Sequence, residues 1–118
     1  MTMKLHSLFR AKNKCTKKWM YGDLVWLKDG KKLVSLIYGK GEADPETISI
    51  FTGKTDRKGM PIYSKDICRF YGSEEETADY LIKWDEDKCR FISIWLFNGA
   101  EDDFDDYFAE CCEVIDEL

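Results

Sequence analysis

The sequence predicts a mainly β fold of the small α+β kind, in which β-hairpins and a meander precede one short acidic helix near the C-terminal end. Short runs of β-branched and aromatic residues recur along the chain, and turn residues such as Gly and Asp separate them. With 44% hydrophobic and 14% aromatic residues among 118, the chain can bury one modest core or two joined subdomains. No apolar run approaches the about 20 residues of a membrane helix, and residues 1–10 lack the apolar segment of a signal peptide. We therefore expect a compact, soluble, cytoplasmic protein that does not contact a membrane.

The first third of the chain predicts three strands. Alternating residues predict one over residues 4–11, and aromatic and apolar residues predict a second over residues 19–27. Asp29-Gly30 stands between that strand and the apolar run 33–37, and Asp-Gly in this setting is the strongest short-range hairpin signal. Residues 38–41 are expected to form a flexible link after the apolar run 33–37. Their Gly-x-Gly lacks the further residues of a phosphate loop, so no nucleotide site is expected there.

Residues 47–66 predict a β-hairpin. β-branched and aromatic residues form its first strand, and Asp56 and Gly59 supply a turn-initiating carboxylate and a glycine suited to the left-handed conformation. Asp66 is expected to bond a nearby backbone N–H in a second turn. Turn chemistry accounts for both carboxylates without a catalytic role.

The meander is predicted from three strands over residues 67–71, 80–84 and 90–97, which acidic turns separate. Short twisted strands of this kind can close into a small SH3-like barrel, and closure hides strand edges from unwanted pairing.

The helix is predicted over residues from about 101 to 110. Phe104, Tyr107, Phe108 and Cys111 recur at the spacing of one helix face, and the acids that precede them suit a first helical turn. The segment around Asp105 lacks the glycine and the closing glutamate of a calcium loop, so no calcium is expected.

Charge divides the chain into two halves. Residues 1–60 carry 13 Lys and Arg against 6 Asp and Glu, and residues 61–118 carry 5 against 17. We expect a single domain over residues 1–118 that contains two β subdomains, basic to about residue 60 and acidic from 61 onward. The asymmetry is compatible with a nucleic-acid surface, with attraction between subunits, or with neutralisation inside one molecule, and the last is the simplest.

A signature run identifies a family resemblance. The pattern P-x-T-I-x-x-[FY]-T-G-x-x-D-x-x-G-x-x-I-[YF]-x-x-D-[IV] is filled in register by Pro45, Thr47, Ile48, Phe51, Thr52, Gly53, Asp56, Gly59, Ile62, Tyr63, Asp66 and Ile67. In these residues the chain resembles the YopX family of phage and prophage proteins. Phe9-Arg10-Ala11 resembles the family's opening F-R-A-W with Lys12 in place of the tryptophan, and residues 112–115 resemble its E-V-I ending. The resemblance implies a predominantly β fold and a phage or prophage origin in a host cytoplasm, and it implies no cofactor or catalytic residue.

The cysteines and the histidine predict no metal site. The five cysteines show no C-x-x-C spacing and are expected to remain thiols, and His6 is the only histidine. Cys68 and Cys89 lie in apolar strand patterns and are expected in the core. One of Cys111 and Cys112 should face the core, with redox activity of the pair as the alternative.

The first functional hypothesis is a non-enzymatic protein-interaction module that binds a phage or host protein or a second copy of itself. It would use strand edges and the exposed aromatics Trp19, Tyr21, Tyr80, Trp84 and Trp95, for which core packing is the alternative. The second hypothesis is nucleic-acid binding through basic residues of the N-terminal half, namely Arg10, Lys12, Lys14, Lys17, Lys18, Lys54, Arg57 and Lys58.

The third hypothesis is a metal-dependent hydrolase. It requires several of Asp23, Asp56, Asp66, Asp79 and Asp85 to meet in one pocket. The sequence shows no spacing that brings them together, so we expect a protein without enzymatic activity.

Overall fold

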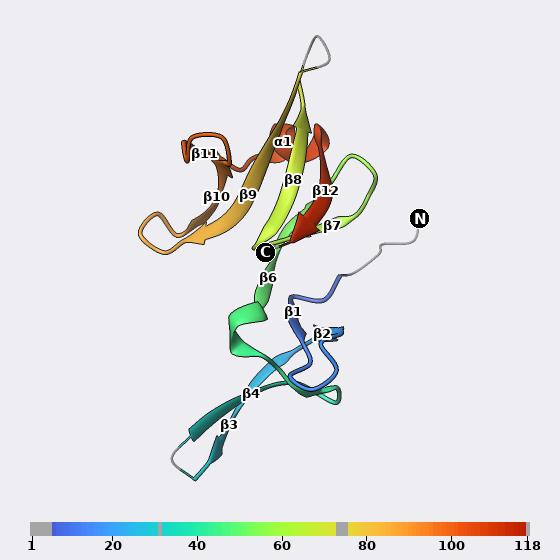
Figure 1. The fold of residues 1–118 in the computed structure, drawn as a ribbon, viewed down its shortest axis with the longest axis vertical. Coiled ribbons are helices and arrows are strands. Elements are labelled where there is room, and N and C mark those ends of the chain that lie inside the picture. Colours follow the sequence, from blue (N-terminus) through green and yellow to red (C-terminus); the bar gives the residue numbers. More distant parts are fainter. Residues whose placement is uncertain (1–5, 31, 73–75, 118) are drawn as a thin grey trace. The chain divides into compact units, whose positions relative to one another are not determined.

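The computed structural model describes residues 6–30, 32–72 and 76–117 (Figure 1). The chain divides into two compact units, Met1–Phe51 and Thr52–Leu118, which we call the first and the second unit. The first unit carries 10 Lys and Arg against 5 Asp and Glu, and the second carries 8 against 18. The charge asymmetry therefore follows the structural units, although the boundary falls at residue 51 and the sequence predicted a change at about residue 60.

Two small sheets build the first unit. β1 (Phe9–Lys12) pairs antiparallel with β2 (Trp19–Gly22) and with the beginning of β6 (Ser49–Thr55). The second sheet has the order β3 (Leu24–Asp29), β4 (Lys32–Ile37), β5 (Gly41–Glu42), so β3 is an edge strand. A 3-10 helix, η1 (Pro45–Thr47), precedes β6.

The core of the first unit is small. It consists of Ala11, Met20, Ile37 and Ala43, with half-buried Phe9, Leu24 and Ile48 packed against it. Among the described side chains of the β3–β4 hairpin, those at its base, Leu24 and Ile37, belong to this cluster. The rest of the hairpin extends away from β1 and β2 (Figure 1).

The prediction of one continuous strand over residues 19–27 is wrong. Gly22 has φ +155°, and a Cβ on it would lie 3.1 Å from Cγ2 of Ile37. The glycine lets the chain turn between β2 and β3, which lie in different sheets. The predicted first strand begins only at Phe9, and residues 4 and 5 lie outside the described residues. The predicted hairpin on either side of Asp29-Gly30 is confirmed.

A five-stranded antiparallel sheet dominates the second unit, in the order β11-β10-β9-β8-β12. The predicted meander is confirmed as β8 (Asp66–Tyr71), β9 (Thr77–Asp85) and β10 (Arg90–Trp95), although β10 ends before Phe97. The later part of β6 pairs with β7 (Pro61–Tyr63), which confirms the predicted hairpin of residues 47–66. Closure into an SH3-like barrel stays a prediction.

The prediction of a helix from about 101 to 110 is wrong in its first half. Residues 101–103 form β11 (Glu101–Asp103), which pairs with β10, and α1 covers only Asp106–Glu110. Asp105 caps the helix, because its Oδ1 accepts a hydrogen bond from the N–H of Phe108 at 2.8 Å. The residues before the cap thus pair as a strand, although their acidic side chains suit the first turn of a helix.

β12 (Cys112–Glu117) is an element that the sequence did not predict. It pairs antiparallel with β8 and forms one edge of the five-stranded sheet, with an irregularity between Val114 and Asp116. Its acids and its position after a short helix concealed the strand pattern.

Both signature carboxylates are confirmed as turn residues. Asp56 is 6% exposed, and its Oδ1 accepts hydrogen bonds from the N–H groups of Lys58 and Met60 at 2.8 and 2.9 Å. Its Oδ2 accepts a third bond, from the N–H of Val114 at 2.9 Å, and so ties the turn to β12. Asp66 is fully buried and accepts from the N–H of Tyr63 at 2.8 Å.

The core of the second unit packs α1 against the sheet. The buried cluster comprises Ile62, Cys68, Ile82, Phe104, Phe108, Ala109 and Cys112. Cys68 and Cys112 confirm the predictions for the core. The prediction that Cys89 is a core residue is wrong, because Cys89 is exposed with φ 50° in the turn before β10. All five cysteines are free thiols.

Candidate functional site

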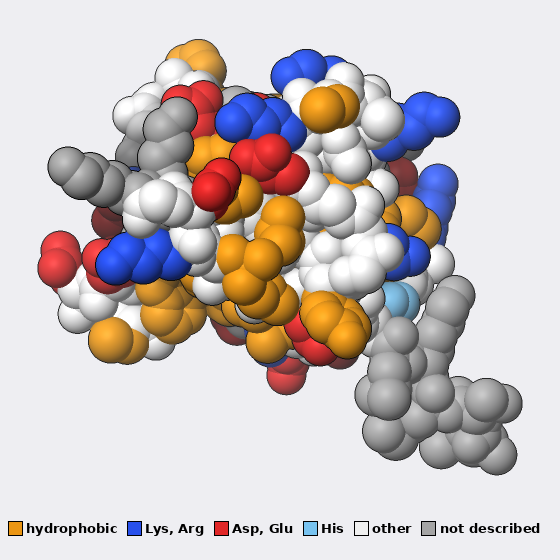
Figure 2. All heavy atoms as spheres, turned by 90° about the horizontal axis from the view of Figure 1, so that it is seen from below, with side chains coloured by type: hydrophobic (Ala, Val, Ile, Leu, Met, Phe, Trp, Pro, Cys, Tyr) orange, Lys and Arg blue, Asp and Glu red, His pale blue; other side chains and the backbone are white. Residues whose placement is uncertain are grey.

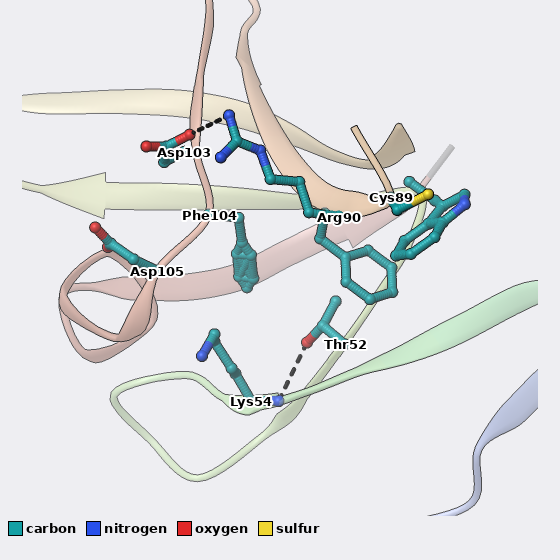
Figure 3. Close-up of a pocket in the computed structure, with 9 residues that line it drawn as sticks. Thr52, Lys54, Cys89, Arg90, Asp103, Phe104 and Asp105 are labelled. Carbon is teal, nitrogen blue, oxygen red and sulfur yellow. Dashed lines mark hydrogen bonds and ion pairs between the residues drawn. The ribbon is translucent and has the colours of Figure 1, made fainter. Parts of the chain in front are cut away.

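The second unit contains a pocket of about 450 Å³ (Figure 3). Strand β6 forms one side, and the turn before β10 and the segment after β11 form the others. Trp84 and Phe91 meet edge to face in its wall, with ring centroids 4.9 Å apart. The lining residues are Thr52, Lys54, Trp84, Cys89, Arg90, Phe91, Asp103, Phe104 and Asp105.

The charged groups of this pocket already have partners. Nη2 of Arg90 lies 2.9 Å from Oδ1 of Asp103. Lys54 forms an ion pair with Asp106, and Asp105 caps α1. The pocket therefore has an aromatic wall, and its charged side chains are in ion pairs or cap α1. These charges favour neither an anionic nor a cationic ligand.

The potential nucleophiles of the pocket are also engaged. Oγ1 of Thr52 donates to the carbonyl of Ile62 at 2.7 Å and accepts from the N–H of Lys54 at 3.2 Å. The thiol of Cys89 donates to the carbonyl of Glu86 at 3.4 Å. Both groups are thus held by hydrogen bonds to backbone carbonyls.

The carboxylates named for a hydrolase are dispersed. Asp79 lines a groove of about 460 Å³ beside Trp95 and Phe97, whereas Asp85 lines a different groove of about 470 Å³. Asp56 and Asp66 lie in their turns, and Asp23 belongs to the first unit. Within the described ranges, no group of three or more His, Cys, Asp or Glu is arranged to hold a metal ion.

The three predicted contact residues of the second unit are paired with acids. Lys54 contacts Asp106, and Arg57 and Lys58 lie 3.6 and 3.5 Å from Oε1 of Glu113. Neutralisation inside the unit therefore accounts for these three candidates for nucleic-acid contact.

The basic residues of the first unit fall into two groups. Arg10 is 6% exposed, and its guanidinium lies 4.4 Å from the ring centroid of Trp19, with Nζ of Lys12 at 5.1 Å from the same ring. The remaining three lie in the exposed loop between β1 and β2, where Lys14 is 3.5 Å from Glu42: they are Lys14, Lys17 and Lys18. This loop therefore presents a cluster of three exposed cations, and for two of them, Lys17 and Lys18, the described residues show no ion pair.

Most of the predicted interaction aromatics are half-buried. Trp19 lies under Arg10, Tyr80 packs against the core of the second unit, and Trp84 and Trp95 contact Phe91 and Phe97. Tyr21 is the exception, since it is 45% exposed.

Sequence reasoning missed the apolar residues with larger exposure. Trp26 and Leu27 in β3 are 52% and 50% exposed, Tyr38 is 75% exposed, and Phe97 is 83% exposed. Figure 2 shows hydrophobic side chains exposed among charged ones on the face that it presents. The apolar run 25–27 predicted a strand, and nothing local in the sequence shows that the hairpin extends beyond the core.

The outer edge of β3 can be defined from its pairing. The N–H of Tyr38 donates to the carbonyl of Asp23 at 2.9 Å, and the register continues as Leu24 opposite Ile37. Because hydrogen-bonded and non-hydrogen-bonded pairs alternate in an antiparallel ladder, Leu24, Trp26 and Lys28 direct their N–H and C=O groups away from β4. No strand lies on that side of β3 within the described residues.

Comparison with protein families identifies a family for this chain. The family model described as YopX protein matches residues 8–115, which is nearly the whole chain. No curated protein matches the chain. No helix in the described part of the chain is long and apolar enough to cross a membrane.

Proposed function

The chain belongs to the YopX family, and we propose that it is a non-enzymatic module that binds another protein by adding a strand of that protein to β3. The observation that carries this proposal is an open edge strand with two large apolar side chains, Trp26 and Leu27, each about half exposed. An edge with unpaired N–H and C=O groups is a template for strand addition, and exposed side chains beside it give specificity.

The outer part of the β3–β4 hairpin has little support within its own unit. β5 pairs with Leu36 and Ile37, and the buried Ser35 still bonds Ala43 through its carbonyl and its hydroxyl at 2.9 and 3.2 Å, so within the described residues the hairpin has two strands only beyond Ser35. A two-stranded ribbon is marginally stable in water, and a third strand would stabilise it. A partner strand on β3 supplies this third strand and covers Trp26 and Leu27.

The sequence of β3 carries little protection against pairing. Native edge strands are commonly blocked by proline, by bulges or by several charges. β3 contains no proline, its register with β4 is regular, and among its residues only Lys28 and Asp29 at one end are charged. Covering the exposed halves of Trp26 and Leu27 would contribute about 2 kcal/mol, if full burial of a large apolar side chain contributes about 1.5–3 kcal/mol.

The partner in this proposal is a phage or host protein, or a second copy of the chain, in the cytoplasm of the host cell. The backbone hydrogen bonds that hold Thr52 and Cys89 and the structural use of Asp56 and Asp66 support a binding role over a catalytic one.

Nucleic-acid binding is the alternative function, and one observation favours it. Lys14, Lys17 and Lys18 are exposed on one loop of a unit that carries 10 basic residues against 5 acidic ones. Contact with phosphates through such a loop would weaken steeply with salt, because binding would release counterions. Reversal of these three charges would then abolish retention of nucleic acid.

The experiment is an affinity capture from host lysate, with and without nuclease, followed by mass spectrometry. It compares the wild type with Leu27→Asp, and the matched control is Leu96→Asp, since Leu27 and Leu96 are both 50% exposed. The proposal expects a protein partner that survives nuclease, is lost with Leu27→Asp and is kept with Leu96→Asp. Retention of nucleic acid alone, or of a partner indifferent to Leu27, would contradict it.

A further inference from the structure

We infer that the strand added to β3 is β3 of a second copy of this chain, related by a two-fold axis at Leu27. This inference rests on the proposed function and names the partner. The edge geometry, the apolar exposure and the charge pattern of β3 each restrict how two copies can pair.

The edge geometry limits the register. In an antiparallel pair, residues whose N–H and C=O groups point to the new partner must lie opposite residues that do the same. The outward residues of β3 are Leu24, Trp26 and Lys28. A symmetric pair of β3 strands can therefore be centred on Trp26 or on Leu27, and each choice pairs most of the strand.

Charge decides between these two registers. An axis at Trp26 places Asp23 opposite Asp29 of the second copy, and like charges directly opposite each other destabilise a sheet. An axis at Leu27 places Trp26 opposite Lys28 of the second copy, and Asp29 opposite Val25. No like charges then face each other across the new pair.

The register centred on Leu27 also uses the exposed apolar surface. Leu27 meets Leu27 of the second copy in a non-hydrogen-bonded pair, where side chains approach most closely. Each Trp26 ring faces the ammonium group of a Lys28, and this pairing adds a cation–π attraction twice by symmetry. Trp26 and Leu27 project from opposite faces of β3, and this register places a side chain of the copy beside each of them.

A two-fold interface also limits further assembly, because an edge strand that stays open can pair with additional chains. Once two β3 edges have paired, neither is open, so the assembly closes as a dimer. Four strands, β4-β3-β3-β4, would then replace two separate ribbons, and a sheet of three or more strands is more stable than an isolated hairpin.

The test is a charge-swap experiment at Leu27, with mass measured by light scattering or sedimentation over a range of concentrations. Wild-type protein should reach twice the chain mass of 13.9 kDa. Leu27→Asp alone and Leu27→Lys alone should each remain at the chain mass, because like charges face each other across the axis. An equimolar mixture should recover the dimer, since Asp and Lys then face each other, and this recovery also shows that both variants are folded.

Leu96→Asp and Leu96→Lys provide the matched control and should behave as the wild type, alone and mixed. A wild type that stays at the chain mass at every concentration would overturn the inference, as would a mixture that fails to recover the dimer. If the wild type is monomeric but captures a foreign protein that depends on Leu27, self-pairing is wrong and the proposed function stands. If neither a second copy nor any other protein depends on Leu27, both are wrong.

Discussion

The carboxylate of Asp56 holds the signature turn to the C-terminal strand, and its replacement should destabilise the second unit. Its three hydrogen bonds come from the backbone N–H groups of Lys58, Met60 and Val114 at 2.8, 2.9 and 2.9 Å. Lys58 and Met60 are exposed, so water can replace the carboxylate at their N–H groups, whereas Val114 is half-buried.

The magnitude follows from this difference in exposure. A hydrogen bond to a charged group contributes about 1.5–3 kcal/mol when its loss leaves a partner without a substitute, and less when water replaces it. We assign about 2 kcal/mol to the bond with Val114 and about 1 kcal/mol to the two turn bonds together, which gives about 3 kcal/mol for Asp56→Ala. For a unit of this size, that corresponds to a fall in Tm of about 12–24 °C.

Asp56→Asn separates the two contributions. The amide oxygen can still accept from Lys58 and Met60, but the amide nitrogen cannot accept from Val114, so the expected loss is about 2 kcal/mol. Urea unfolding followed by circular dichroism measures both variants, and amide hydrogen exchange at Val114 reports the lost bond directly. If Asp56→Asn is as stable as the wild type and Val114 stays protected, the structural account of this carboxylate is wrong.

Three further outcomes are expected. Phe108→Ala should cost about 3–5 kcal/mol of unfolding free energy because Phe108 is 7% exposed among aromatic rings, whereas Tyr107→Ala, at a residue 66% exposed on the same helix, should stay within about 0.5 kcal/mol in the same urea titration. The hydrogen bond with the Cys112 thiol and burial raise the pKa of Cys68 above its ordinary 9.0. The stabilisation from the protonated Cys68 thiol is therefore complete below pH 9.0 and is lost as the pH rises above it. Mass spectrometry after alkylation should find the exposed Cys15 labelled long before the buried Cys68. Lys28→Pro, which removes an outward N–H but leaves the ladder to β4 intact, should weaken self-association by more than Lys28→Ala does in sedimentation; equal effects would show that only the charge matters.

The sequence predicted much of the fold because its local signals agreed with the tertiary structure. Asp29-Gly30 and the Asp56–Gly59 turn specify hairpins through local interactions, namely left-handed glycines and the bonds from the Asp56 carboxylate to its own turn, and both hairpins are confirmed. The meander also followed, since each strand is short and bounded by polar turns. Where Gly22 interrupts an apolar run, the break depends on contact with Ile37, which a local pattern does not reveal.

The C-terminal segment and the candidate site were predicted less well, because both depend on tertiary contacts. Residues 101–103 pair with β10 although their acids suit the first turn of a helix. β12 is held by its pairing with β8 and by the carboxylate of Asp56. Lys54, Arg57 and Lys58 looked like free cations in the sequence, yet each lies against an acid from a distant segment. The exposure of β3 follows from the structure, because the core of the first unit ends at Leu24 and Ile37 and the later residues of β3 lie outside it.

The central claim is that β3 is a free edge that receives a strand, and backbone amide hydrogen exchange tests it most directly. The outward amides of Trp26 and Lys28 should exchange rapidly in the dilute chain, while those of Val25 and Leu27, bonded to β4, exchange slowly. At concentrations where the chain assembles, or with a captured protein bound, the amides of Trp26 and Lys28 should become protected as well. Exchange at these two amides that is the same in the dilute and assembled states would contradict strand addition at β3.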